Sequence, residues 1–134
     1  MKILHKPSET LRDAVIELME NDDWERVYQS DEFGFDWAKE RKWTVYKLTL
    51  EGDAVIQGLI SVEDVPKEYR SHIHLIENKV SNKGKDKVYD YVAGCLIAYV
   101  CSVCPNTHNF LLVNKLSRNY ASKNNKFVND FKAL

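Results

Sequence analysis

The sequence predicts an α/β fold with a mixed, mostly antiparallel central sheet and helices on both faces. Apolar and polar residues alternate over residues 44–50 and 72–78, which is typical of half-buried strands. Between residues 92 and 103 the apolar residues recur at helical spacing, and a short apolar run follows at 110–113. A strand, a helix and a second strand in this order form a crossover, which adds a parallel strand to the sheet.

The composition is that of an ordinary globular protein. The chain has 134 residues, of which 44% are apolar and 29% charged, so we expect one domain over residues 1–134. Its longest apolar run, Leu96–Val100, is too short to span a bilayer, and residues 1–20 lack the apolar stretch of a secretory signal. Three closely spaced cysteines favour reduced thiols, and we therefore expect a cytoplasmic protein.

The first third of the chain is predicted to hold a short strand and a helix. Residues 1–5 form the strand, and residues 7–10 resemble the entry of a helix. Four apolar residues then share one helical face: Leu11, Val15, Leu18 and Met19. The segment 24–43 that follows is rich in aromatic residues: Trp24, Phe33, Phe35 and Trp37. We expect it to pack over the rest of the domain, either as a second helix or as a flap over a site.

Residues 44–78 are predicted to form three strands. The turn signal Glu51-Gly52-Asp53 joins the alternating run 44–50 to a return strand over 54–62, which gives a hairpin. Residues 64–71, which contain Pro66, connect the hairpin to a third strand over 72–78.

A polar segment over 78–87 separates this third strand from the next helix. It carries four lysines around Gly84: Lys79, Lys83, Lys85 and Lys87. The helix is predicted from Val92 to Pro105, and a short strand follows at 110–113. Ser117 can cap a last helix that ends near residue 124, and residues 126–131 can add a closing strand.

Charge is distributed unevenly along the chain. Residues 1–64 carry 8 basic and 15 acidic side chains, whereas residues 65–134 carry 11 and 5, for a total of -1. Either the basic half binds an anionic ligand, or the two halves attract one another. The entry of the 92–105 helix is a candidate anion site, because the first amides of a helix are free and its dipole is positive there. The alternative is a solvated, lysine-rich loop, since no phosphate-binding glycine motif is present.

Residues 44–127 resemble the GNAT superfamily of N-acetyltransferases. The resemblance is carried by Ile56–Ser61 in the hairpin, His74–Glu77 in the third strand, Tyr89–Leu96 at the helix entry and Asn114–Tyr120 at the final helix. It implies a GNAT-like fold that is shortened at the C-terminus, because the family usually ends with a strand hairpin. A bare sheet edge invites pairing with a second copy, so we expect a homodimer, which sedimentation would test.

The same resemblance implies acetyl-coenzyme A as cofactor. In the family, a segment of the pattern Arg/Gln-x-x-Gly-x-Gly/Ala binds the pyrophosphate through backbone N–H groups. Residues 89–94 are the preferred register, with Gly94 matched but bulky residues elsewhere, and residues 81–86 are the second, with Gly84 matched. The implied cofactor-binding residues are Asn78, Tyr89, Asp90, Tyr91, Val92, Ala93, Gly94 and Asn114.

Acetyl transfer to an amine needs a base that takes the ammonium proton and an acid that protonates the leaving thiolate. The family commonly takes its acid from a tyrosine on the last helix, where Tyr120 stands; Tyr120 is otherwise a residue at the edge of the core. Glu77 and Glu63 are the candidate bases. The acceptor is expected to be a small-molecule or protein amine. The alternative is a catalytically inactive GNAT-fold protein that acts by binding a partner.

Two further patterns, one typical of metal ligands and one typical of nucleic-acid binding, are weaker indications of function. Cys101-x-x-Cys104 with His108 has the spacing of metal ligands, and His72 and His74 add nitrogen donors. A closed zinc site usually needs two such knuckles, so no metal is expected. Basic residues near Tyr120 are compatible with nucleic-acid binding, but the isoelectric point of about 6.4 and the absence of a binding motif favour a solvated helix face.

Overall fold

The computed structural model describes residues 1–68, 70–103 and 110–112. Seven strands form one sheet in the order β6-β1-β2-β3-β4-β5-β7, and all neighbours are antiparallel except β5 and β7, which are parallel. The strands are β1 (Lys2–His5), β2 (Thr10–Leu18), β3 (Thr44–Leu50), β4 (Ile56–Val65), β5 (Arg70–Asn78), β6 (Tyr89–Asp90) and β7 (Phe110–Leu112). This confirms an α/β fold with a mixed, mostly antiparallel sheet.

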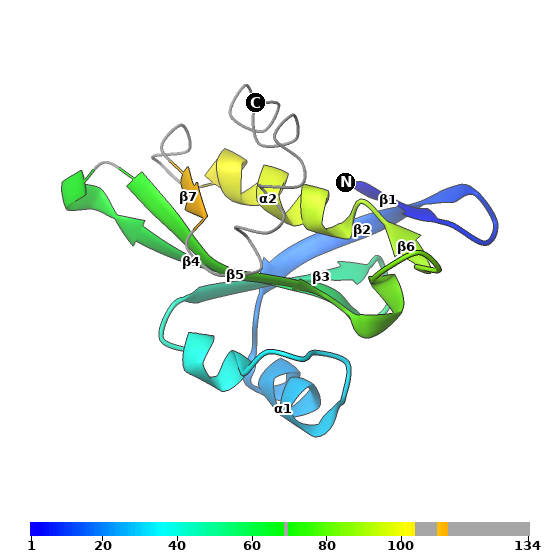
Figure 1. Ribbon diagram of the computed structural model, residues 1–134, viewed down its shortest axis with the longest axis horizontal. Coiled ribbons are helices and arrows are strands. Elements are labelled where there is room, and N and C mark those ends of the chain that lie inside the picture. Colours follow the sequence, from blue (N-terminus) through cyan, green and yellow to red (C-terminus); the bar gives the residue numbers. More distant parts are fainter. Residues whose placement is uncertain (69, 104–109, 113–134) are drawn as a thin grey trace.

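In the part of the chain that the structure describes, two α-helices and three short 3-10 turns accompany the sheet. They are α1 (Asn21–Gln29), η1 (Trp37–Glu40), η2 (Pro66–Glu68), η3 (Val80–Asn82) and α2 (Val92–Val103). In Figure 1, α2 lies above the sheet, whereas α1 and η1 lie below it. No helix within the described ranges has the length and apolar character that crossing a membrane requires.

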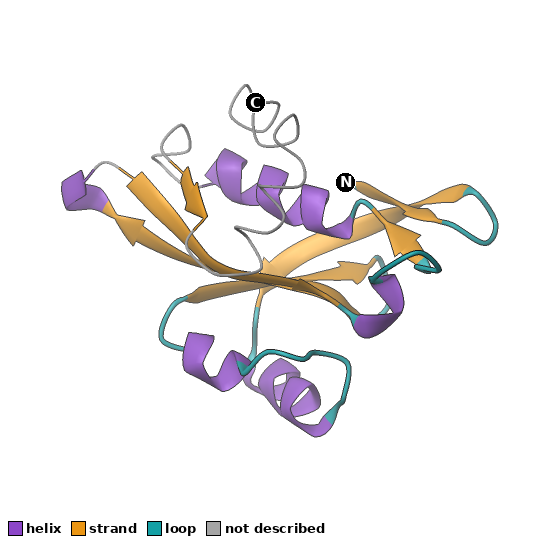
Figure 2. Cartoon of the chain, in the orientation of Figure 1, coloured by secondary structure: helices purple, strands orange, loops and turns teal. Residues whose placement is uncertain are grey.

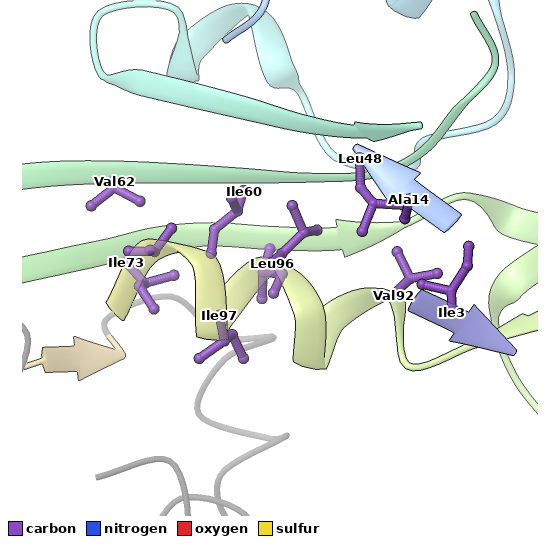
Figure 3. Packing of buried hydrophobic residues seen from close by; sticks show 11 residues of the cluster. Ile3, Ala14, Leu48, Ile60, Val62, Ile73, Val92, Leu96 and Ile97 are labelled. Carbon is purple, nitrogen blue, oxygen red and sulfur yellow. The ribbon is translucent and has the colours of Figure 1, made fainter. Parts of the chain in front are cut away.

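The core consists of two clusters of buried side chains. The first joins α2 to the sheet and contains Ile3, Ala14, Leu48, Ile60, Val62, Ile73, Ile76, Val92, Leu96, Ile97 and Val100 (Figure 3). The second contains Trp24, Val27, Trp37, Val45, Ile56, Leu59 and Leu75. Neighbouring residues of β4, such as Leu59 and Ile60, contribute to different clusters because successive side chains of a strand point to opposite faces.

The predicted helix over 11–19 is wrong: this segment is strand β2. Residues 6–9 form the turn of a β1–β2 hairpin, with Glu9 at a φ of 53°. Ala14 and Ile16 point into the first cluster, whereas Leu11 and Leu18, which the helical stripe would bury, are each 57% exposed. Pairing with β1 and β3 therefore overrides the apparent helical period.

The predicted strands at 1–5, 44–50, 54–62 and 72–78 and the helix from residue 92 are confirmed, with bounds shifted by a few residues. The connection predicted over 64–71 is shorter, because β4 extends to Val65 and β5 begins at Arg70. The aromatic segment contains a true helix, α1, followed by a loop and η1. The helix after Ser117 and the strand at 126–131 lie outside the described residues.

Candidate functional site

The connection from β5 to α2 lies at one end of the sheet, where β6 joins β1 (Figure 2). The buried side chain of Asn82 holds this connection in place through hydrogen bonds. Its Nδ2 donates to the carbonyl oxygen of Gln57 at 3.1 Å and to the Gln57 side chain at 2.9 Å, and its Oδ1 accepts from the amide of Tyr89 at 3.0 Å. The amide of Val88 donates to the carbonyl of Ser81 at 2.8 Å. Hydrogen bonds thus hold the ends of this lysine-rich segment to β4 and to one another.

Glu77, a candidate base, is 1% exposed near the end of β5. Its carboxylate accepts four hydrogen bonds: from the amides of Gly34 (2.7 Å) and Phe35 (3.2 Å), the indole Nε1 of Trp37 (2.9 Å) and the ammonium of Lys83 (2.5 Å). It therefore joins β5 to the 34–37 segment and to the loop before α2.

The environment of Glu77 keeps it ionised. Burial raises the pKa of its carboxyl group, but the hydrogen bonds from Lys83, Trp37 and the two amides outweigh burial and lower the pKa from its ordinary value of 4.5. Accepting a proton requires at least one of these hydrogen bonds to break. In this arrangement, Glu77 is suited to hold the loop on the sheet.

The N-terminus of α2 has both free amides and a fixed negative charge. The helix begins with the hydrogen bond from the amide of Cys95 to the carbonyl of Tyr91 at 2.9 Å. Within the described part of the chain, the structure gives the amides of Val92, Ala93 and Gly94 no acceptor. Asp90 occupies the entry, where its Oδ1 accepts from the amide of Tyr91 at 2.8 Å.

Tyr91 has a φ of 73° and is 55% exposed. A positive φ is uncommon for a residue with a side chain, and here it reverses the chain between β6 and α2. The exposed ring of Tyr91 contrasts with buried Val92, which belongs to the first cluster. Of the predicted cofactor-binding segment, Val92 is thus a packing residue, whereas Tyr91 is exposed and Ala93 and Gly94 are half-buried.

The four lysines of the connection have different partners. Lys83 pairs with Glu77, and Lys87 lies 3.5 Å from Asp90. Lys85 is exposed and has no ion pair within residues 1–68, 70–103 and 110–112, whereas Lys79 lines a cavity beside α1. After this internal pairing, Lys85 remains as an exposed cationic side chain of the connection.

The cavity has a volume of about 230 Å³ and lies beside α1 and the start of β4. Its lining residues are Arg26, Val27, Ser30, Glu32, Phe33, Ala54, Val55, Ile56 and Lys79. The Oε2 atom of Glu32 is buried and has no hydrogen-bond partner in the described chain, and the carbonyl of Glu32 accepts from the amide of Val80 at 2.9 Å. The cavity thus combines an apolar wall with one carboxylate oxygen that can accept from a ligand amine, and it is also lined by the cationic Arg26 and Lys79.

Glu63 lies on β4, away from Glu77. Because Leu59 is the register partner of Glu77, four residues of β4 separate the two acids, which corresponds to about 13 Å along the strand. Glu63 instead accepts a hydrogen bond from, or pairs with, His74 at 2.8 Å between Oε1 and Nε2. The structure thus does not bring the two candidate bases together. Tyr120 and Asn114 lie outside the described residues.

Asn78, the last residue of β5, has a buried Oδ1 atom without a partner among the described residues. Burial raises the pKa of the Cys95 thiol, which makes it a poor nucleophile at neutral pH.

The sequence did not reveal the hydrogen-bond partners of Glu77 or the role of Asn82 in the connection. For the hydrogen bond from Trp37 to Glu77, the sequence offered one indication, namely the excess of aromatic residues in the segment 24–43.

No described protein family, curated protein or solved structure matches this chain.

Proposed function

We propose that the protein is a GNAT-like acyltransferase that moves an acetyl group from acetyl-coenzyme A to an amine. The strand order carries this proposal. Four antiparallel strands, β2 to β5, are followed by α2 and then by β7, which is parallel to β5. The sequence resemblance implies this succession, with the cofactor bound where the helix begins. We also propose that the protein shares two further features implied by the resemblance: helices that cover both faces of the sheet, and a C-terminus shorter than is usual in the family.

The entry of α2 is the proposed site for the diphosphate of the cofactor. Free amides of Val92, Ala93 and Gly94 can donate to phosphate oxygens, and Lys85 can add long-range attraction. Asp90 opposes an anion at this position, since two like charges at about 4 Å repel by about 1 kcal/mol even in water. Affinity for the cofactor is therefore expected to be modest.

The cavity beside α1 is the proposed acceptor site. Its apolar lining and the unpartnered Oε2 of Glu32 suit an amine with an apolar substituent. Lys79 lines the cavity and directly follows β5, so the cavity adjoins the start of the connection that leads to the α2 entry. In the transfer, the amine nitrogen forms the C–N bond, the C–S bond breaks, and the thiolate takes a proton from an acid, for which Tyr120 is the candidate.

Of the two candidate bases, Glu63 is better supported than Glu77. The side chain of Glu63 is 32% exposed and pairs with His74, whereas Glu77 is buried and at least one of its four hydrogen bonds would have to break. Because Glu63 lies on β4 away from the α2 entry, proton transfer from the amine to Glu63 has to pass through water.

Calorimetric titration of the full chain with acetyl-coenzyme A tests the proposal. We expect micromolar binding, a roughly fivefold gain in affinity for Asp90→Asn, because about 1 kcal/mol of repulsion is removed, and a loss for Lys85→Met. Glu25→Gln, an exposed charge change on α1, serves as the control and should leave binding unchanged. Absence of heat at millimolar ligand, or equal affinity in all three variants, would exclude a cofactor site at α2.

The second candidate is a non-catalytic binding protein of the same fold. Two observations favour it. The carboxylate of Glu77 is fully occupied by hydrogen bonds that hold the loop, and the carboxylate of Asp90 accepts from the amide of Tyr91 at the helix entry, where it opposes an anion. Release of coenzyme A in the presence of simple amines separates the candidates. Cofactor binding without any release of free thiol would support the binding protein.

A further inference from the structure

Three potential metal ligands meet on β4 and β5. Glu63 and His72 are register partners in the β4–β5 ladder, Val62 pairs with Ile73, and the register then shifts between Val62 and Ser61, opposite His74. Glu63, His72 and His74, here called the His–Glu cluster, each offer one ligand atom, and these atoms all lie within 4.8 Å of one another. All three residues are half-buried.

The imidazole of His74 is held in place on two sides. Its Nε2 lies 2.8 Å from Oε1 of Glu63, and its ring stacks on Trp43 with centroids 4.3 Å apart and planes 4° from parallel. Such stacking limits the rotation of the ring and fixes the direction of its nitrogen atoms. A ligand that is already oriented loses little conformational entropy when it binds an ion.

His72 contributes a nitrogen without a hydrogen bond. Its Nε2 is buried and has no partner among the described residues, and its ring centroid lies 5.8 Å from that of His74. Burial lowers the pKa of His72, and the charge of Arg70 lowers it further, against the opposite effect of Glu63. The unpartnered Nε2 of His72 can therefore offer its lone pair to a metal ion.

We propose that Glu63, His72 and His74 bind a divalent transition-metal ion of the zinc type and leave at least one coordination position open. Two imidazoles and one carboxylate suit zinc better than magnesium or calcium, which prefer oxygen ligands alone. Tetrahedral zinc with bonds near 2.05 Å places its ligand atoms about 3.4 Å apart. The 2.8 Å contact has to open and the longer separations to close, which small side-chain rotations achieve. Glu63 is also the favoured base of the proposed acyl transfer, but zinc binding is measured without that reaction, so either proposal can fail alone.

Titration of the full chain with Zn²⁺, after removal of metals by chelation, tests the site. We expect one ion per chain, and a loss of affinity of about 100-fold for His72→Ala and for His74→Ala, since one of three protein ligands is gone. His5→Ala removes a histidine outside the cluster, which contacts Ser8 and Tyr89, and should bind as the unmodified chain does. No binding at millimolar Zn²⁺, or equal binding by all three variants, would overturn the proposal.

Two further measurements distinguish the His–Glu cluster from cysteine ligands and from the misfolding of a variant. Cobalt(II) in the His–Glu cluster should show visible ligand-field bands without the near-ultraviolet thiolate charge-transfer band, whereas a strong thiolate band would assign the ion to cysteines instead. Imidazole nitrogen resonances of the unmodified chain give a result even if a variant fails to fold. Zinc should shift those of His72 and His74 and leave His5 in place, and shifts elsewhere alone would contradict the site.

Discussion

Glu77 shows how a single buried charge can organise a loop. It is 1% exposed, yet it accepts hydrogen bonds from two backbone amides, an indole and a lysine. Hydrogen bonds to a charged acceptor contribute more than neutral ones, and a buried charge without them is costly. The position of the 34–37 segment against the sheet therefore depends on this carboxylate.

Replacement of Glu77 by glutamine should lower the free energy of unfolding by about 2 kcal/mol, because a neutral amide cannot accept from all four donors. Glu51→Gln changes an exposed glutamate in the β3–β4 turn and should alter stability by less than about 0.5 kcal/mol. Urea unfolding at pH 7 measures both. If the two variants are equally stable, the hydrogen bonds of Glu77 do not hold the loop.

The sequence indicated Glu77 as a functional acid but gave no sign of its partners. Gly34 and Trp37 are about 40 positions away in the chain, and a single sequence does not reveal contacts of that separation. For the His–Glu cluster, the sequence pattern predicted part of the arrangement. The alternation of His72 and His74 on a predicted strand placed them on one face, whereas pairing with Glu63 required the register of the hairpin.

At the scale of elements, the strands between residues 44 and 78 and the helix α2 could be predicted because their patterns are long and regular. Strand β2 could not be predicted, since Leu11, Val15 and Leu18 match a helical period by coincidence. Its partners β1 and β3, which satisfy its backbone hydrogen bonds, determine its conformation.

The packing of α2 on β4 depends on a glycine. A Cβ atom at Gly58 would lie 2.6 Å from Cγ1 of Val92 and 3.1 Å from Cδ1 of Leu96, closer than normal contact. The backbone of β4 can approach the first turn of α2 only because this position has no side chain.

Gly58→Ala should therefore destabilise the protein by about 1–3 kcal/mol, the usual cost of overpacking a core. Gly94→Ala is the matched change on α2, where a Cβ would have no neighbour within 4 Å, and it should raise stability by up to about 1 kcal/mol through helix propensity. Thermal and urea unfolding compare the pair. A harmless Gly58→Ala variant would mean that α2 is not seated on β4 as described.

At the scale of the whole molecule, one pair joins the acidic and basic halves among the described residues, that of Glu63 with His74, whereas other ion pairs lie within one half. Lys47 pairs with Asp23 in the acidic half, and Lys83 with Glu77 in the basic half. The homodimer stays a prediction.

Acid should destabilise the protein in two stages. The pKa of half-buried His72 lies below its ordinary 6.5, so its folded form resists protonation and stability declines as the pH falls below about 6.5. For Glu77 and Asp23 burial raises the pKa, but hydrogen bonds with Lys83 and Lys47, among others, lower it below the ordinary 4.5 and 3.8. Their contribution is complete above those values and is lost as the pH falls through the folded pKa values.

Unfolding by urea between pH 8 and about pH 3, followed by tryptophan fluorescence, measures this profile. The decline should steepen below pH 4.5, and Glu77→Gln should remove part of that second stage. A stability that rises on acidification would contradict the ionised, hydrogen-bonded state of both acids.

The single parallel pairing among the described strands bears on the order in which the chain folds. The hairpins β1–β2, β3–β4 and β4–β5 close through short turns, whereas pairing of Ser71 with Phe110 requires the intervening chain, α2 included, to return to the sheet. Loop-closure entropy makes such distant pairing slower. During synthesis the β2–β5 meander can therefore form before β7 covers the edge of β5, and slow synthesis or a high concentration of nascent chains would favour aggregation at that edge.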